Sequence, residues 1–221
     1  MKINKEGIIL GVIGILFLAG MGFVIIKTAS SPATLPGSVV PAGDMSILVK
    51  DDSHMTGSPT AKVQMVEFGD YECPFCAQAA PTLKIVADEY KSNPNFNFVF
   101  RNFPLPQHQF ALVAAEAAEA AGAQGKFWEM NQMIYGSQDA WVNSKDPVSL
   151  FVTYATSLGL NVNEFKSDIA TNKYSAFINT DLADGTTIGI QHTPTVYLNG
   201  VEATDLSQKA LETQINALLA K

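Results

Sequence analysis

The sequence predicts an α/β protein in which a block of helices interrupts a core of strands and helices, behind an N-terminal transmembrane helix. Three observations predict this. Gly7 to Ile26 is a mostly apolar run of 20 residues without charge, and 20 helical residues rise about 30 Å, the thickness of a bilayer core. Strand-like segments occur near residues 63–68, 96–100 and 195–203. Between the last two of these segments the patterns are helical.

Composition excludes several classes of protein. The 221 residues include 14 Lys and Arg against 21 Asp and Glu, a net charge of −7, and 47% are hydrophobic. This is too apolar for a disordered chain, and an acidic chain binds nucleic acid poorly because phosphates need clustered cations. Two cysteines cannot build a disulfide-dense scaffold or a four-cysteine zinc site.

The apolar run is best read as an uncleaved signal anchor. Two lysines precede it and one follows, so the positive-inside rule places residues 1–6 in the cytoplasm and the remainder outside. A cleaved signal peptide is the alternative, but the run exceeds the usual apolar core and no clear small-residue cleavage site follows. A buried helix in water would be weakened by the five glycines of the run. We expect a cytoplasmic tail at 1–6 and an anchor at 7–26.

Residues 27–60 are expected to form a linker and a lead-in segment. Ser, Pro and Gly punctuate residues 28–44, which have no periodicity. Ile47-Leu48-Val49 suits a short edge strand or a docking segment, and Asp51 to Pro59 suits a turn-rich approach to the domain.

The domain itself is expected to span residues 61–221. Val63 to Phe68 has the alternation of a strand, Ala77 to Tyr90 has the composition of a helix with Pro74 in its first turn, and Phe96 to Phe100 alternates again.

A helical insertion is expected at about 104–189, followed by a closing hairpin and helix. Asn199-Gly200 is a strong two-residue hairpin signal between strands at Thr195–Leu198 and Val201–Ala203, and an amphipathic helix is expected over Leu206–Ala220. The helices predicted within the insertion are Gln109–Ala123, Phe127–Tyr135, Pro147–Leu158, Val162–Thr171 and Tyr174–Ile188.

The chemistry of the sequence is concentrated in Cys73-Pro74-Phe75-Cys76, which holds both cysteines of the chain at a strand-to-helix junction. Residues three apart in the first helical turn lie on one face, so the two sulfurs can form a disulfide. Free N–H groups and the helix dipole favour a thiolate at Cys73. A lowered pKa makes that sulfur the nucleophile and the better leaving group. Cys76, further in, would be the resolving thiol.

Three other interpretations of the cysteine pair compete with a redox role. A purely structural disulfide would close so short a loop that it stabilises little. Half of a zinc site would need two more ligands, and the histidines are His54, His108 and His192. Two unpaired core cysteines are the third possibility. A redox-active pair is favoured for two reasons: the spacing and the position at a helix start suit a reactive pair, and dithiols can be oxidised in a compartment outside the cytosol.

Two segments carry a resemblance to a known family. Residues 66–76, Val-Glu-Phe-Gly-Asp-Tyr-Glu-Cys-Pro-Phe-Cys, resemble the active-site segment of DsbA-like thiol-disulfide oxidoreductases. Residues 192–200, His-Thr-Pro-Thr-Val-Tyr-Leu-Asn-Gly, resemble their second signature, a loop with a cis proline. The resemblance covers about residues 46–221. It implies a thioredoxin-like fold with an inserted all-helical domain, a protein thiol-disulfide oxidoreductase activity, and no cofactor or metal.

The resemblance also implies roles for individual residues. Cys73 is the attacking thiol and Cys76 its partner in a Cys73–Cys76 disulfide. Pro194 is the cis proline that faces the disulfide, while the Thr193 backbone binds an extended substrate peptide. Glu67 takes the place of the family's buried acid, where a raised pKa would let it relay a proton to Cys76. An exposed glutamate on the strand face is the alternative for Glu67.

One departure from the family affects the expected chemistry. The strongly oxidising prototype has Pro-His between its cysteines, and this chain has Pro-Phe. Phe75 offers Cys73 no hydrogen bond or positive charge, so we expect the disulfide to be a milder oxidant than that of the prototype. We also expect Phe75 to bind substrate together with Thr193 and Pro194. His192 either supplies positive charge near the sulfur or is a surface histidine. No role is assigned to His108.

These observations predict an oxidoreductase on the outer face of the cytoplasmic membrane that forms or exchanges disulfides in secreted or membrane proteins. Its partners would be reduced or misoxidised substrate proteins, a membrane redox partner and the membrane itself, without nucleic acid. A reductase or isomerase fed by a membrane electron donor remains an alternative. A redox-inert module that binds peptides or a metal is an alternative from another class.

Overall fold

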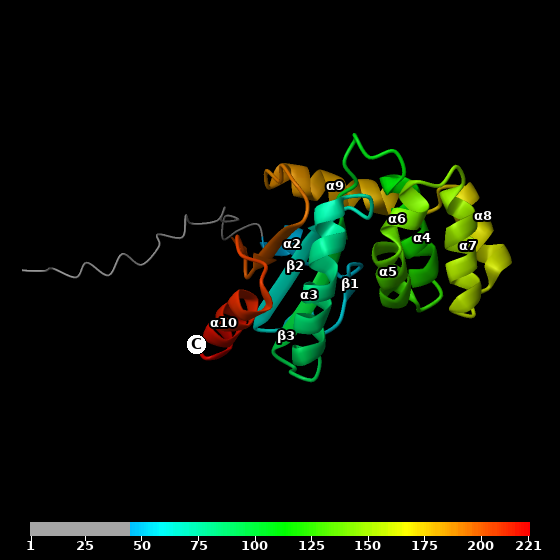
Figure 1. Cartoon of the computed structure of the whole chain (residues 1–221). Coiled ribbons are helices and arrows are strands. Elements are labelled where there is room, and N and C mark those ends of the chain that lie inside the picture. Colours follow the sequence, from blue (N-terminus) through cyan, green and yellow to red (C-terminus); the bar gives the residue numbers. More distant parts are fainter. Residues whose placement is uncertain (1–44) are drawn as a thin grey trace, which may run out of the picture. The chain divides into compact units, whose positions relative to one another are not determined.

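A mixed sheet organises the part of the chain that the computed structural model describes, residues 45–221 (Figure 1). Its strands follow the order β1-β3-β2-β4-β5. β2 and β3 are parallel, and every other neighbouring pair is antiparallel. The strands are β1 (His54–Met55), β2 (Val63–Gly69), β3 (Phe96–Asn102), β4 (Thr195–Leu198) and β5 (Val201–Glu202).

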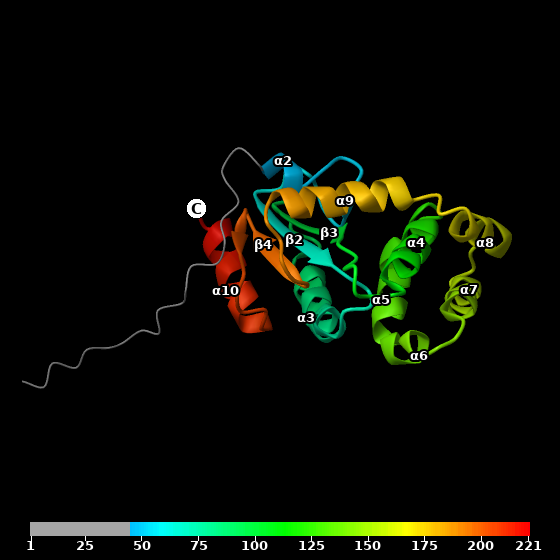
Figure 2. The same ribbon diagram turned by 90° about the horizontal axis from the view of Figure 1, so that it is seen from above.

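Helices cover both faces of this sheet (Figure 2). On one face, α3 (Pro74–Tyr90) and α10 (Gln208–Leu219) pack Leu83 and Leu211 against Met65. On the other face lie α2 (Met45–Leu48) and α9 (Ser175–Thr187), where Leu48 packs in one buried cluster with Phe68. Side chains of neighbouring residues in a strand point to opposite faces, so both sides of β2 are buried.

The covering helices explain why two predicted strands lack the expected alternation between buried and exposed residues. All seven residues of β2 and all seven of β3 are buried. A strand in the centre of a sheet with helices on both faces has no solvent side. Glu67 and Arg101 are therefore buried with their apolar neighbours.

Between β3 and β4 the described chain forms helices, as the sequence predicts. A second core joins them, built around an alanine-rich helix and large side chains such as Trp141, Phe151 and Phe165. Figure 2 shows this group beside the sheet, with α9 running back from it to the strands. The helices are α4 (Ala111–Gly122), α5 (Phe127–Gly136), α6 (Gln138–Val142), α7 (Pro147–Ser157), α8 (Val162–Ala170) and α9.

The closing hairpin confirms its sequence signal. Asn199 and Gly200 have φ angles of 48° and 81°, and two consecutive positive φ values fit the tight turn that joins antiparallel strands. The return strand is one residue shorter than predicted and ends at Glu202, although the Ala203 N–H still donates to the Val196 carbonyl at 2.8 Å. Leu206 precedes the last helix, which begins at Gln208 after the cap formed by Ser207.

Three elements near the strand–helix boundaries differ from the sequence analysis. Residues 47–49 form no edge strand; they lie at and after the short helix α2, and because Leu48 is buried in the cluster with Phe68, the alternative of a docking segment is confirmed. The approach at 51–59 contains turns, as expected, and also the short strand β1, which was not predicted and pairs with β3. The short helix α6 was missed, since five residues are too few to show a period.

The predicted cytoplasmic tail, the anchor and residues 27–44 lie outside the described residues. Within residues 45–221, no helix has the length and hydropathy that a membrane span requires. The domain boundaries given above stay predictions.

Candidate active site

The two cysteines lie at the start of α3, directly after the turn that follows β2. Cys73 is the N-cap residue, with extended backbone angles of −70° and 120°, and Pro74 is the first residue of the helix. Proline fits there because its missing N–H would have no partner in a first turn. Both cysteines are free thiols, Cys73 4% exposed and Cys76 fully buried. The predicted disulfide between them stays a prediction.

The environment of Cys73 favours its thiolate. Its pKa is lowered to about 5, chiefly by a hydrogen bond from the Cys76 thiol and further by the Thr193 side chain and by the backbone N–H groups of Cys76 and Phe75, against an opposing effect of burial. These N–H groups belong to the first turn of α3, where a helix leaves its donors free. The helix start thus contributes as the sequence suggests, but the neighbouring thiol contributes more.

The environment of Cys76 favours the protonated thiol. Burial raises its pKa most, followed by its hydrogen bond to Cys73 and by negative charge at Glu67 and Cys73. One contact acts the other way, since the Asp70 N–H lies 3.5 Å from Cys76 Sγ and lowers this pKa. Two sulfurs three residues apart therefore have opposite acid–base properties.

Glu67 lies in β2 and is 3% exposed, so the alternative of an exposed strand-face glutamate is wrong. Burial raises the pKa of its carboxyl to about 8, which keeps it protonated at neutral pH. Its Oε1 has no hydrogen-bond partner among the described residues.

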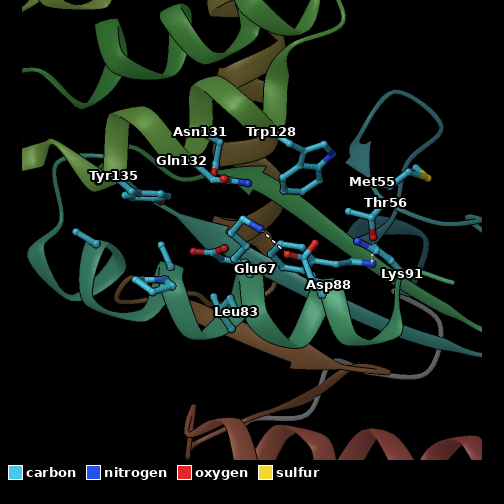
Figure 3. Close-up of a pocket in the computed structure, with 17 residues that line it drawn as sticks. Met55, Thr56, Glu67, Leu83, Asp88, Lys91, Trp128, Asn131, Gln132 and Tyr135 are labelled. Carbon is cyan, nitrogen blue, oxygen red and sulfur yellow. Dashed lines mark hydrogen bonds and ion pairs between the residues drawn. The ribbon is translucent and has the colours of Figure 1, made fainter. Parts of the chain in front are cut away.

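Glu67 lines a cavity of about 590 Å³ that also includes residues of α3 and α5. Figure 3 shows its carboxyl between Leu83 of α3 and Tyr135 of α5, with Trp128 further along the cavity. Glu67 also contributes to raising the pKa of Cys76. The structure therefore buries this carboxyl where its charge acts on the pKa of Cys76, and its catalytic role stays a prediction.

The peptide bond between Thr193 and Pro194 is cis, as the resemblance predicted. Cys73 Sγ donates a hydrogen bond of 3.3 Å to the Thr193 carbonyl. Phe75, 65% exposed, lines a shallow pocket with His192, Thr193 and Pro194. The structure thus brings together the residues predicted to bind substrate. The His192 side chain is 66% exposed, with Nε2 3.7 Å from Glu202 Oε1, which fits the surface alternative.

Three residues that the sequence analysis did not select also contact the active-site turn. Gln138 Nε2 donates to the carbonyls of Tyr71 and Cys73, at 2.7 and 3.0 Å. Asp70 Oδ2 and His108 Nδ1 lie 2.7 Å apart, at hydrogen-bond distance. Their separation along the chain is 38 residues, so only the position of Asp70 directly after a strand gave a signal in the sequence.

The chain is similar in sequence to one part of longer curated proteins. Among curated proteins, the Na(+)/H(+) antiporter NhaA 1 of Salinispora arenicola is 36% identical over 151 residues, which are 68% of this chain and 22% of the antiporter. The chain therefore spans less than a quarter of that relative's length, and the printed name describes the longer protein.

Solved structures share the fold at low sequence identity. BdbD from Bacillus subtilis, in its oxidised form, is 19% identical with a TM-score of 0.69, covering 84% of this chain and 98% of BdbD. Alpha-DsbA1 from Wolbachia pipientis is 20% identical with a TM-score of 0.70, covering 80% and 96%. A protein family described as Thioredoxin matches residues 50–217. Because that match includes all five strands, both cysteines and the cis Thr193–Pro194 bond, the chain belongs to this thioredoxin family.

Proposed function

We propose that the protein is a thiol-disulfide oxidoreductase that forms disulfides in other proteins through Cys73 and Cys76. The observation that carries this proposal is the opposite behaviour of the two sulfurs, with the pKa of Cys73 lowered to about 5 and that of Cys76 raised. A stable thiolate is a good leaving group. Reduction of the pair is therefore favoured, and this makes the disulfide an oxidant.

The reaction proceeds in two exchanges. A substrate thiolate attacks Cys73 Sγ of the Cys73–Cys76 disulfide, the bond between the two sulfurs breaks, and Cys76 leaves as a thiolate that takes up a proton. A second substrate thiolate then attacks the substrate sulfur of the mixed disulfide, and Cys73 leaves as a thiolate. The substrate loses two electrons and gains a disulfide, while the protein pair gains the two electrons.

Glu67 suits the role of proton donor to Cys76. Its carboxyl is neutral up to a pH of about 8, so it carries a transferable proton at neutral pH. A charge at Glu67 raises the pKa of Cys76, so the two groups do not both hold a charge easily: when Cys76 leaves as a thiolate, the neutral Glu67 carboxyl can give it a proton and becomes the single buried anion, which then takes a proton back from water.

The shallow pocket beside the cis bond suits the substrate chain. Its walls are apolar at Phe75 and Pro194, and the Thr193 carbonyl already contacts Cys73 Sγ. An extended peptide that adds to this edge would bring its own sulfur towards Cys73. The partners proposed here are proteins with reduced or wrongly paired cysteines and a redox protein that reoxidises the pair.

We propose a location on the outer side of the cytoplasmic membrane, held by residues 7–26. The charge bias around that run and the oxidising chemistry downstream support this location. Protease added to intact spheroplasts is expected to digest the domain, and protection of the entire chain would contradict the orientation. Release of the intact chain by alkaline carbonate would contradict the anchor.

Trapping of substrates tests the proposed function. Cys76→Ala removes the sulfur that resolves mixed disulfides, so this variant is expected to accumulate proteins bound to Cys73 that a reductant releases. Cys73→Ala and the double variant are the matched controls and are expected to trap nothing. Absence of mixed disulfides with Cys76→Ala, or equal trapping by Cys73→Ala, would overturn the assigned roles.

A further inference from the structure

We propose that His108 is a positioning residue that acts through Asp70 to hold a backbone N–H against Cys76 Sγ, and so assists the steps in which Cys76 carries negative charge. This inference rests on the proposed function and concerns the same site. It starts from five contacts of Asp70, the residue that follows β2.

The main chain of Asp70 touches both cysteines. Its N–H points at Cys76 Sγ at 3.5 Å, and its carbonyl accepts a hydrogen bond of 3.1 Å from the Cys73 N–H. A shift of this one residue would therefore move a donor away from Cys76 and loosen the N-cap of α3 at the same time.

The side chain of Asp70 fixes that main chain. Oδ1 accepts from the Glu72 N–H at 2.8 Å, and Oδ2 accepts from the Leu105 N–H and from His108 Nδ1, both at 2.7 Å. The Asp70 side chain is fully buried and that of His108 is 18% exposed. Since the carboxylate already accepts two backbone N–H bonds, the ring nitrogen is assigned as the third donor.

Besides Gln138, one segment supplies several partners of this turn, residues 103–110, which follow β3. The Phe103 N–H donates to the Gly69 carbonyl at 2.8 Å, and the Phe110 N–H donates to Glu72 Oε2. The segment thus holds the active-site turn at Gly69, Asp70 and Glu72. His108 contacts the turn through its side chain, whereas the other residues of the segment do so through backbone N–H groups. A substitution at His108 can therefore remove this one contact and leave the backbone contacts in place.

The Asp70 N–H matters because Cys76 has little else to stabilise its charge. Burial and the charges at Glu67 and Cys73 raise its pKa, and the Asp70 N–H lowers it. When a substrate thiolate opens the disulfide, Cys76 leaves with the bonding electron pair. In the reverse step, the Cys76 thiolate attacks Cys73 Sγ of the mixed disulfide, re-forms the internal disulfide and expels the substrate thiolate, which takes a proton from water. Both steps pass through a charge on Cys76.

The test follows the reverse reaction, in which the reduced protein reduces a disulfide, because Cys73 and Cys76 then attack in two successive steps. Reduced protein is mixed with a peptide joined to glutathione by a disulfide, and the reaction is stopped by acid at intervals and read by mass spectrometry. Attack by Cys73 releases glutathione and forms the peptide mixed disulfide. Attack by Cys76 then releases the peptide.

His108→Ala is expected to slow peptide release about fivefold to tenfold, the loss typical of one hydrogen bond, and to change the first attack less than about twofold. The mixed disulfide should therefore accumulate. His108→Asn, whose amide nitrogen can occupy the place of Nδ1, should restore most of the rate. The longer side chain of His108→Gln places its amide beyond the position of Nδ1, so this variant should slow peptide release as His108→Ala does. If the His108→Ala protein does not fold, His108→Gln takes its place in the measurement.

His54→Ala is the matched control. His54 Nε2 contacts Glu119 Oε2 at 2.6 Å, and its side chain is 21% exposed, so the substitution removes a comparable His–carboxylate pair in which the carboxylate belongs to α4. It should leave both rates unchanged. Unchanged peptide release in His108→Ala, equal slowing of both steps, or the same slowing in His54→Ala would overturn the positioning role. If the wild-type protein forms no mixed disulfide at all, the proposed function itself fails.

Discussion

Replacing Glu67 by glutamine tests a buried carboxyl whose pKa departs strongly from its ordinary value. The folded protein holds this carboxyl at a pKa of about 8, against an ordinary value of 4.5, because burial disfavours its charge. Glutamine has nearly the same shape and cannot ionise. Glu67→Gln is therefore expected to raise the free energy of unfolding by an amount that depends on pH.

The sign and size follow from proton linkage. Below pH 4.5 the carboxyl is protonated in both states, so the wild-type protein and the variant should differ little. Between pH 4.5 and about 8 the unfolded chain loses the proton and the folded protein keeps it, so the wild-type protein loses about 1.4 kcal/mol of stability per pH unit through this group. At pH 7 the advantage of the variant should be about 3 kcal/mol, an upper limit.

Urea unfolding of the reduced proteins at pH 5, 6 and 7, extrapolated to zero urea, measures this difference. Taking the variant against the wild-type protein at each pH cancels the titration of all shared groups. Glu89→Gln, on the exposed side of α3, controls for a Glu→Gln exchange outside the core. A difference that stays flat from pH 5 to 7 would refute the reasoning, and a variant that becomes less stable as the pH rises would show that Glu67 is held as a carboxylate.

Two further predictions concern Cys73 and Phe75. Alkylation of the reduced protein by iodoacetamide should modify Cys73 with half-maximal reactivity near pH 5, the value its surroundings set, and should leave Cys76 unmodified there; mass spectrometry of the peptides identifies the sulfur, and first reaction at Cys76 would contradict the assignment. Phe75→His should make the disulfide more oxidising, because a ring N–H beside the helix start can donate to the Cys73 thiolate; an unchanged or lower potential in a glutathione buffer would contradict this.

The sequence allowed the long elements to be predicted because their patterns are local. The alanine-rich run became α4 and the Asn199-Gly200 pair became a tight turn, since propensity and turn chemistry act over a few residues. β1 and α2 could not be predicted in this way. β1 has two residues and exists through its pairing with Phe100 and Val99 of β3, a contact that no local pattern contains.

The residues of the candidate site also fall into those that a local motif predicts and those that depend on contacts between distant segments. Cys73, Cys76 and Pro194 lie in short motifs, and the structure brings the first and last together through Thr193. Alternation along β2 left Glu67 either buried or exposed, and only the helices on both faces decided between them. The link between Asp70 and His108 spans 38 residues. It depends on how the chain leaves β3, which neither motif describes.

The equilibrium of the cysteine pair with glutathione tests the central claim most directly. The purified protein is incubated in buffers of graded reduced-to-oxidised glutathione, quenched, and the fractions of dithiol and disulfide are measured. A redox-active pair with a low-pKa Cys73 and with Phe75 between the cysteines should show one two-electron transition, at a potential between about −270 and −120 mV, above thioredoxin and below DsbA. A pair that remains a dithiol, or remains a disulfide, through the whole range would contradict the account.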